Sequence, residues 1–229
     1  YVVYFAFGAS GLNPVLSIVL SMIVCTILGV VIERLAYRPL REAPSLAVLI
    51  TAIGVSYLLQ QVAQLSWSSN PKSFTSVVSG MKPVSLFGGQ LTISAETIVT
   101  IVACVVIMVV LMWFVNYTPA GHAMLAVSED RGAAQLMGVN VNGTISLTFA
   151  IGSALAAIAG ALLCSSYPTL QPTTGAMPGI KAFVAAVFGG IGSIPGAFVG
   201  GILLGIIENL SKAYISTQLS DAIVFLVLV

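Results

Sequence analysis

The chain has 229 residues, of which 58% are hydrophobic and only 7% are charged, whereas a soluble globular domain carries about 25% charged residues. Eight basic and seven acidic side chains cannot cover the surface of a soluble fold of this size, so the composition indicates that lipid hydrocarbon is the solvent. The formal net charge of +1 argues against electrostatic binding of nucleic acid.

Several segments are long enough to cross a bilayer, which takes about 20 mostly apolar residues. In chain order the predicted spans are 15–32, 46–65, 98–115 and 145–164, followed by a long interrupted segment at 182–207. The two apolar ends, 1–12 and 221–229, supply partial segments. We therefore expect an all-α, polytopic membrane helix bundle with a broken or re-entrant helix near its C-terminal end. Residues 1–229 are interpreted as one membrane-spanning domain, a fragment truncated at both ends.

The loops between the predicted spans differ in charge. Loops 33–43 and 116–143 together hold four arginines, whereas loops 66–95 and 165–179 hold two lysines, Lys72 and Lys82. Alternate loops of a polytopic bundle face opposite sides of the membrane, and a compact arginine-rich loop favours the cytoplasm. We predict that loops 33–43 and 116–143 are cytoplasmic and that the other pair faces outward.

The interrupted segment contains the run GGIGSIPG at residues 189–196. Gly costs about 1 kcal/mol and Pro about 3 kcal/mol relative to Ala in a helix interior. Non-helical backbone survives at membrane depth only when it is buried in protein or lines a wet cavity. The run therefore interrupts one span, closes a re-entrant pair of half-helices near a substrate path, or forms a turn at the membrane face between two short tilted helices. Its candidate residues are Gly189, Gly190 and Gly192, which can take a positive φ, Ser193, which can pair a freed backbone group, Pro195, which removes a helical donor, and Gly196.

Small residues recur at a spacing of four in two of the predicted helices. Residues four apart share a helix face, and a stripe of small side chains lets a neighbouring backbone come close. The pattern fits both fixed packing and helices that slide during a transport cycle. The stripes are Gly152, Ala156 and Gly160 with Ser153, Ala157 and Ala161 one residue later, and Ala197, Gly201 and Gly205 after the break.

A short amphipathic helix is predicted within loop 116–143 by the stretch SEDRGAAQLMGVNV. Ser128 can cap it, and Glu129 and Asp130 in its first turn suit the positive end of the helix dipole. Gly138 can end the helix, and Ala134 lies on the apolar face that would meet a partner. Such a helix between two spans offers a docking surface on the cytoplasmic side.

Chemistry of the usual enzymatic kinds is not indicated. The sequence has no phosphate-binding GxxxxGK[ST] loop, no HExxH or GxSxG motif, and no paired carboxylates. Its three cysteines lie in apolar runs without a CxxC pair or a His cluster, so neither a disulfide framework nor a metal site is predicted. No span has a central charged residue, which weakens ion-coupled carrier and ion-pore readings. We expect no catalytic residue and no cofactor, with energy supplied by an ATP-hydrolysing partner.

Four stretches together resemble the permease subunits of bacterial branched-chain amino acid ABC transporters of the Liv type. They are ERLAYRPLR, LITAIGVSYLLQ, AVSEDRGAAQLMGVNV and GIKAFVAAVFGGIGSIPGAFVGGILLGIIE, in that order. The resemblance implies a multi-pass, non-enzymatic subunit of the bacterial plasma (inner) membrane. It also implies a second permease subunit, two cytoplasmic ATPase subunits, and a periplasmic or extracellular binding protein that delivers branched-chain or related amino acids.

The resemblance also places an ATPase-coupling helix at 129–138. Its residues are Glu129, Asp130, Arg131, Gly132, Ala133, Ala134 and Gly138. Gly132 stands where the general importer pattern EAAxxxG has its Glu, which leaves open any salt bridge to the ATPase. Two alternatives stay open: a permease of the same superfamily for urea, a short amide or a simple sugar, and a self-sufficient carrier or channel.

Overall fold

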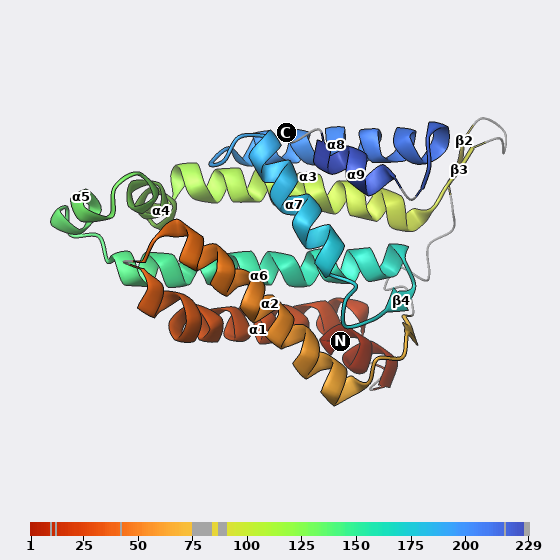
Figure 1. The fold of residues 1–229 in the computed structure, drawn as a ribbon, viewed down its shortest axis with the longest axis horizontal. Coiled ribbons are helices and arrows are strands. Elements are labelled where there is room, and N and C mark those ends of the chain that lie inside the picture. Colours follow the sequence, from red (N-terminus) through yellow and green to blue (C-terminus); the bar gives the residue numbers. More distant parts are fainter. Residues whose placement is uncertain are drawn as a thin grey trace. The chain divides into compact units, whose positions relative to one another are not determined.

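The computed structural model describes residues 1–9, 11, 13–41, 43–74, 84–86, 91–217 and 219–226, and almost all of its regular structure is helical (Figure 1). This confirms the predicted all-α class. The α-helices are α1 (Pro14–Ile32), α2 (Ser45–Trp67), α3 (Ala95–Tyr117), α4 (Pro119–Glu129), α5 (Arg131–Leu136), α6 (Val141–Ser166), α7 (Ala176–Phe188), α8 (Ile194–Tyr214) and α9 (Ser220–Leu226). The π- and 3-10 helices are η1 (Tyr4–Ala9), η2 (Glu33–Tyr37) and η3 (Arg38–Leu40).

Five helices of the described chain are long and apolar enough to cross a membrane. They are Pro14–Leu40, Leu46–Trp67, Ala95–Tyr117, Val141–Ser166 and Ile194–Tyr214. The four uninterrupted spans predicted from the sequence are thereby confirmed, each longer than expected and the first, which extends to Leu40, by the most. The apolar windows of α2 and α3 have 0% of their residues buried, so lipid or other chains can cover these two helices.

The described chain forms two compact units by its internal contacts. The first consists of Tyr1–Ala103 and Phe114–Thr173, and the second of Cys104–Trp113 and Thr174–Val229. The α3 helix contributes its middle part to the second unit and its ends to the first.

Within the first unit, α1 packs along α6, and the two ribbons run side by side in Figure 1. A Cβ built on Gly29 would lie 1.9 Å from the Ser153 side-chain oxygen, so the contact requires glycine there. Ala157 and Ala161, one and two turns further along α6, are buried. The predicted stripe of Ser153, Ala157 and Ala161 therefore packs inside this chain. By contrast, a Cβ on Gly152 or on Gly160 would meet nothing within 4 Å.

Two pairs of loops meet within the first unit. Strand β1 (Lys72–Ser73) pairs antiparallel with β4 (Thr169–Leu170), with Lys72 opposite Leu170, and this joins loop 66–95 to loop 165–179. The other pair of loops meets where Arg131 donates a hydrogen bond to the Arg41 carbonyl oxygen. Strand β2 (Val84–Leu86) pairs with β3 (Leu91–Ile93) in the same long loop, whereas Lys82 lies outside the described residues.

The second unit is built on α7, α8 and α9. Its apolar core consists of Val184, Ala185, Leu204 and Val224. Beside this core the Lys181 ammonium bridges two acidic residues, at 2.9 Å from Glu208 and 2.7 Å from Asp221. The ammonium thereby links the three helices of this unit through side chains that are only partly exposed.

Candidate functional site

The start of α5 is set by Asp130. Its carboxylate oxygen accepts hydrogen bonds from the backbone amides of Gly132, at 2.7 Å, and Ala133, at 3.1 Å. The predicted cap at Ser128 is therefore wrong: Ser128 and Glu129 form the last turn of α4, and the Ser128 hydroxyl donates to the Leu125 carbonyl. Both Ser and Asp are good caps, but the backbone leaves helical geometry only at Asp130, where φ is −147°.

The end of α5 agrees with the sequence. Gly138 takes a φ of +85°, a conformation that favours glycine. The amide of Val139 donates to the Ala134 carbonyl at 3.0 Å, and the amide of Gly138 donates to the Gln135 carbonyl at 3.0 Å. These two bonds form a Schellman motif, which satisfies carbonyls that a helix end otherwise leaves free. The predicted stop at Gly138 is confirmed.

The exposed face of α5 differs from the predicted one. Leu136 and Met137 are 90% and 84% exposed, whereas Ala134 is 4% exposed and faces the rest of the chain. The exposed apolar surface at the end of α5 is therefore Leu136 together with Met137, the residue directly after the helix. Sequence reasoning had these two residues in the helix but chose Ala134 as the docking contact. The sequence did contain a signal for this exposed surface. Leu136 and Met137 are two large apolar residues in a polar loop, directly before the glycine that ends the helix.

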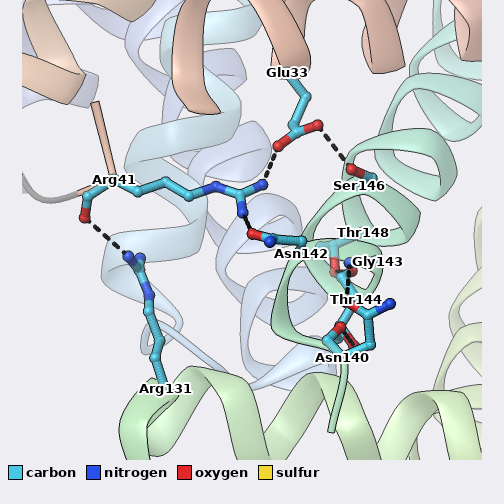
Figure 2. A network of polar contacts seen from close by, with 9 residues as sticks. All are labelled: Glu33, Arg41, Arg131, Asn140, Asn142, Gly143, Thr144, Ser146 and Thr148. Atoms are coloured by element: carbon cyan, nitrogen blue, oxygen red, sulfur yellow. Dashed lines mark hydrogen bonds and ion pairs between the residues drawn. The ribbon is translucent and has the colours of Figure 1, made fainter. Parts of the chain in front are cut away.

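A polar network holds α5 to the ends of α1 and α6 (Figure 2). The Arg41 guanidinium pairs with the Glu33 carboxylate and donates to the Asn142 side-chain oxygen. The Ser146 hydroxyl donates to the second Glu33 oxygen at 2.7 Å. Arg131, the first residue of α5, donates to the Arg41 carbonyl at 3.2 Å. The sequence singled out ERLAYRPLR and SEDRGAAQLMGVNV as separate motifs, and the structure brings them together here.

The N-terminus of α6 (Val141–Ser166) follows α5 after a short connection. Asn140 caps it, because its side-chain oxygen accepts from the Gly143 amide at 3.1 Å. The Thr144 hydroxyl donates to the Asn140 carbonyl at 3.0 Å. Only the short stretch from Met137 to Asn140 separates the last residue of α5 from the first residue of α6.

The predicted helix break is present between α7 and α8. Gly190 and Gly192 have φ of +93° and +97°, as expected for a turn that needs glycine. Gly189 does not, since its φ is −77°, and that part of the prediction is wrong. Its glycine is required for a different reason: a Cβ on Gly189 would lie 2.1 Å from the Gly196 carbonyl oxygen. A Cβ on Gly196 would lie 2.0 Å from the Gly189 carbonyl oxygen, so the two backbones are in direct contact.

Ser193 and Pro195 form the start of α8. The Ser193 hydroxyl accepts from the Gly196 amide at 3.1 Å, which confirms the predicted pairing of a freed backbone group. Pro195 lies in the first turn, where a helix needs no amide donor, so it begins a helix rather than interrupting one. With 13 residues α7 reaches about 20 Å, too short for a hydrocarbon core of about 30 Å, whereas the 21 residues of α8 suffice.

The close packing of α8 on α7 uses a different stripe from the predicted one. A Cβ on Gly200 would lie 2.5 Å from the Ala185 carbonyl oxygen, so Gly196 and Gly200 form the contact face. A Cβ on Gly201 would only touch the Ala185 side chain at 4.0 Å, and a Cβ on Gly205 would meet nothing within 4 Å. The predicted packing of Ala197, Gly201 and Gly205 against a neighbouring helix stays a prediction. Among the described residues no group of three or more His, Cys, Asp or Glu could hold a metal ion.

Over residues 1–229 the sequence matches the family described as "Branched-chain amino acid transport system / permease component". The chain belongs to this family. The permease is 42% identical to the high-affinity branched-chain amino acid transport system permease protein LivH of Escherichia coli (strain K12), over 91% of this chain and 68% of that protein. It is also 42% identical to BraD of Pseudomonas aeruginosa, a permease protein of the same description, over 90% of this chain and 67% of that protein.

A more distant relative has a different name. The permease is 28% identical to the fructose import permease protein FrcC of Rhizobium meliloti, over 86% of this chain and 55% of that protein. No solved structure matches the chain significantly. The family match confirms the resemblance drawn from the four sequence stretches, and a permease component is a transport protein rather than an enzyme.

Proposed function

We propose that this chain is the membrane-spanning permease subunit of an ATP-driven importer of branched-chain or related amino acids in the bacterial inner membrane. The supporting observation is the match of the whole chain to the permease family, at 42% identity to two branched-chain amino acid permeases. A second permease subunit completes the translocation path, two cytoplasmic ATPase subunits drive it, and an external binding protein delivers the amino acid.

In this proposal α5 is the element that docks on an ATPase subunit. Leu136 and Met137 supply an exposed apolar anchor, and Asp130 and Gly138 fix the two ends of the helix. Buried apolar anchors surrounded by polar residues supply much of the binding energy at protein interfaces. Gly132, at the place of the Glu in the importer pattern, is exposed and leaves the docking to these apolar residues.

The turn between α7 and α8 is the proposed place of the substrate path. A short helix that ends in a turn and packs tightly on a full-length helix fits the broken helices that line transport sites. The positive φ of Gly190 and Gly192 fixes the shape of this turn, and an exposed Ile191 lies between them. These features support a role in the pathway for residues 189–196.

A sugar permease is the less supported alternative. The sugar permease relatives FrcC and RbsC are 28% and 32% identical, and the second of these matches covers only 42% of this chain. A self-sufficient carrier is also less supported. The match of the whole chain to a family described as a permease component of a transport system favours a subunit that works with others.

Uptake of a labelled solute panel by proteoliposomes that hold the complete complex tests this function. We expect ATP-dependent uptake of leucine, isoleucine or valine, and no uptake when a non-hydrolysable ATP analogue replaces ATP. The panel includes alanine, urea, ribose and fructose as matched small polar solutes. Uptake of a sugar without any amino acid would refute the substrate class, and amino acid uptake without ATP would refute the energy source.

A further inference from the structure

The segment ERLAYRPLR, at the C-terminal end of the first span, changes helical pitch twice directly after α1. The α-helix α1 ends at Ile32, the π-helix η2 follows, and the 3-10 helix η3 precedes Arg41. Residues eight apart on a regular α-helix lie about two turns, or 12 Å, from each other. Across these turns the long Arg41 side chain reaches the carboxylate of Glu33, eight residues earlier. Single π-turns within helices often mark functional positions.

Glu33 is almost completely buried, with 1% of its side chain exposed. Both of its carboxylate oxygens are engaged, one by the Arg41 guanidinium and the other by the Ser146 hydroxyl. A buried charge is tolerated only when it is paired and hydrogen-bonded. The position of Arg41 is therefore bound to that of Glu33, and Ser146 ties the same carboxylate to α6.

Arg41 connects three elements that are distant in the sequence. Its guanidinium contacts Glu33 in η2 and Asn142 in the first turn of α6, and its carbonyl accepts from Arg131 at the start of α5 (Figure 2). The contacts of α5 with the rest of the chain are few, because of its residues only Ala134 is buried. Besides the short direct link from α5 to α6, the hydrogen bond from Arg131 to Arg41 connects α5 to the end of the first span and, through the Arg41 side chain, to α6.

The guanidinium is not fully satisfied in this conformation. Its Nε atom is buried and has no hydrogen-bond partner among the described residues. A buried donor without an acceptor favours any rearrangement that supplies one. Switching elements use such discrete alternative contacts rather than continuous deformation.

We propose that the Glu33–Arg41 ion pair is the positioning element that transmits movement of the coupling helix α5 to the spans α1 and α6. This inference rests on the proposed function, since it assumes that an ATPase subunit moves α5. Glu33 and Arg41 touch neither ATP nor the transported solute in this account. They act by making α5, α1 and α6 move as one body.

The test compares variants in the complete complex, reconstituted in proteoliposomes, by measuring leucine uptake and ATP hydrolysis in the same preparation. For Arg41→Met we expect hydrolysis to continue while the uptake per ATP hydrolysed falls by about fivefold or more, the lower end of typical coupling effects. Arg41→Lys keeps the charge but cannot bridge Glu33 and Asn142 with one planar guanidinium. Its ratio of uptake to hydrolysis should therefore lie between those of the wild type and Arg41→Met. Arg38→Met, which removes an exposed arginine of the same segment, is the matched control and should keep the wild-type ratio.

The ratio of uptake to hydrolysis separates this role from a purely structural one. If Arg41 only stabilises the fold, both activities fall with the amount of assembled complex and the ratio stays constant, which would overturn the inference. A wild-type ratio in both Arg41→Met and Arg41→Lys would overturn it as well. If the wild-type complex itself shows no ATP-dependent uptake, the proposed function fails before the ion pair is tested.

Discussion

Replacement of Leu136 by Asp is expected to reduce uptake by about tenfold or more, as for loss of an interface anchor worth about 2 kcal/mol. Leu136 is 90% exposed, so the substitution removes no packing inside this chain. It places a charge where an apolar contact with the ATPase is proposed, and an unpaired charge in such a contact is costly. Leucine uptake by the reconstituted complex, normalised to the permease in the membrane, measures the effect.

Two variants of α5 serve as controls for this result. Leu136→Met keeps an apolar side chain of similar size and should retain most of the uptake. Gln135→Glu adds the same charge at the neighbouring position, which is already polar and exposed, and should have a much smaller effect. Normal uptake by Leu136→Asp would show that α5 does not dock through this face. A substitution at Ala134 would not answer the question, because that side chain is buried within the permease.

Gly189→Ala is expected to prevent correct packing of α7 on α8. The new Cβ would lie 2.1 Å from the Gly196 carbonyl oxygen, and a backbone atom cannot move away as a side chain can. Overpacking of this kind costs typically 1–3 kcal/mol and occasionally more. We expect much less folded permease, measured as the monodisperse peak in size-exclusion chromatography in detergent, and a lower melting temperature when the samples are heated before the column.

The same helix hairpin offers a matched control. Gly205→Ala introduces the same methyl group at a position where it meets nothing within 4 Å, so the folded yield should stay at the wild-type level. If Gly189→Ala folds as well as Gly205→Ala, the close backbone contact between α7 and α8 is not a requirement of the fold.

Gly192→Leu should reduce folding less than Gly189→Ala does and more than Gly205→Ala does. Open space surrounds Gly192, but its φ of +97° costs an L-residue about 1–2 kcal/mol. Val199→Leu changes only the volume of an exposed side chain and should be tolerated. Loss of uptake by Gly192→Leu with preserved assembly would favour a place in the pathway, whereas loss of assembly would favour a structural turn. Normal assembly and uptake would contradict both.

Periodicity and composition predict the features that depend on neighbours in the sequence. The spans follow from uninterrupted apolar runs, and the end of α5 follows from Gly138, because a glycine after a short helix adopts the positive φ of a C-terminal cap. The break before α8 follows from GGIGSIPG for the same reason. In these cases the local chemistry of the chain decides the local structure.

Contacts between helices could not be predicted in the same way. Gly29 and Gly200 are required only because of how α1 is turned toward α6, and α7 toward α8, which no local pattern encodes. The Glu33–Arg41 pair was missed because side-chain pairs on a helix are expected at separations of three or four residues, not eight. The cap of α5 was assigned to Ser128 because α4, which holds that residue, was not predicted as a separate helix.

Site-specific photo-crosslinking from α5 tests the central claim most directly. A photoreactive residue at position 136 of the permease, in the complete complex, should yield an adduct with the ATPase subunit. The control probe stands at Leu65, which is 87% exposed near the C-terminal end of α2. This end adjoins loop 66–95, which is predicted to face outward, so the probe should yield no such adduct. An ATPase adduct from position 65 but none from position 136 would contradict both the docking role of α5 and the proposed orientation of the permease.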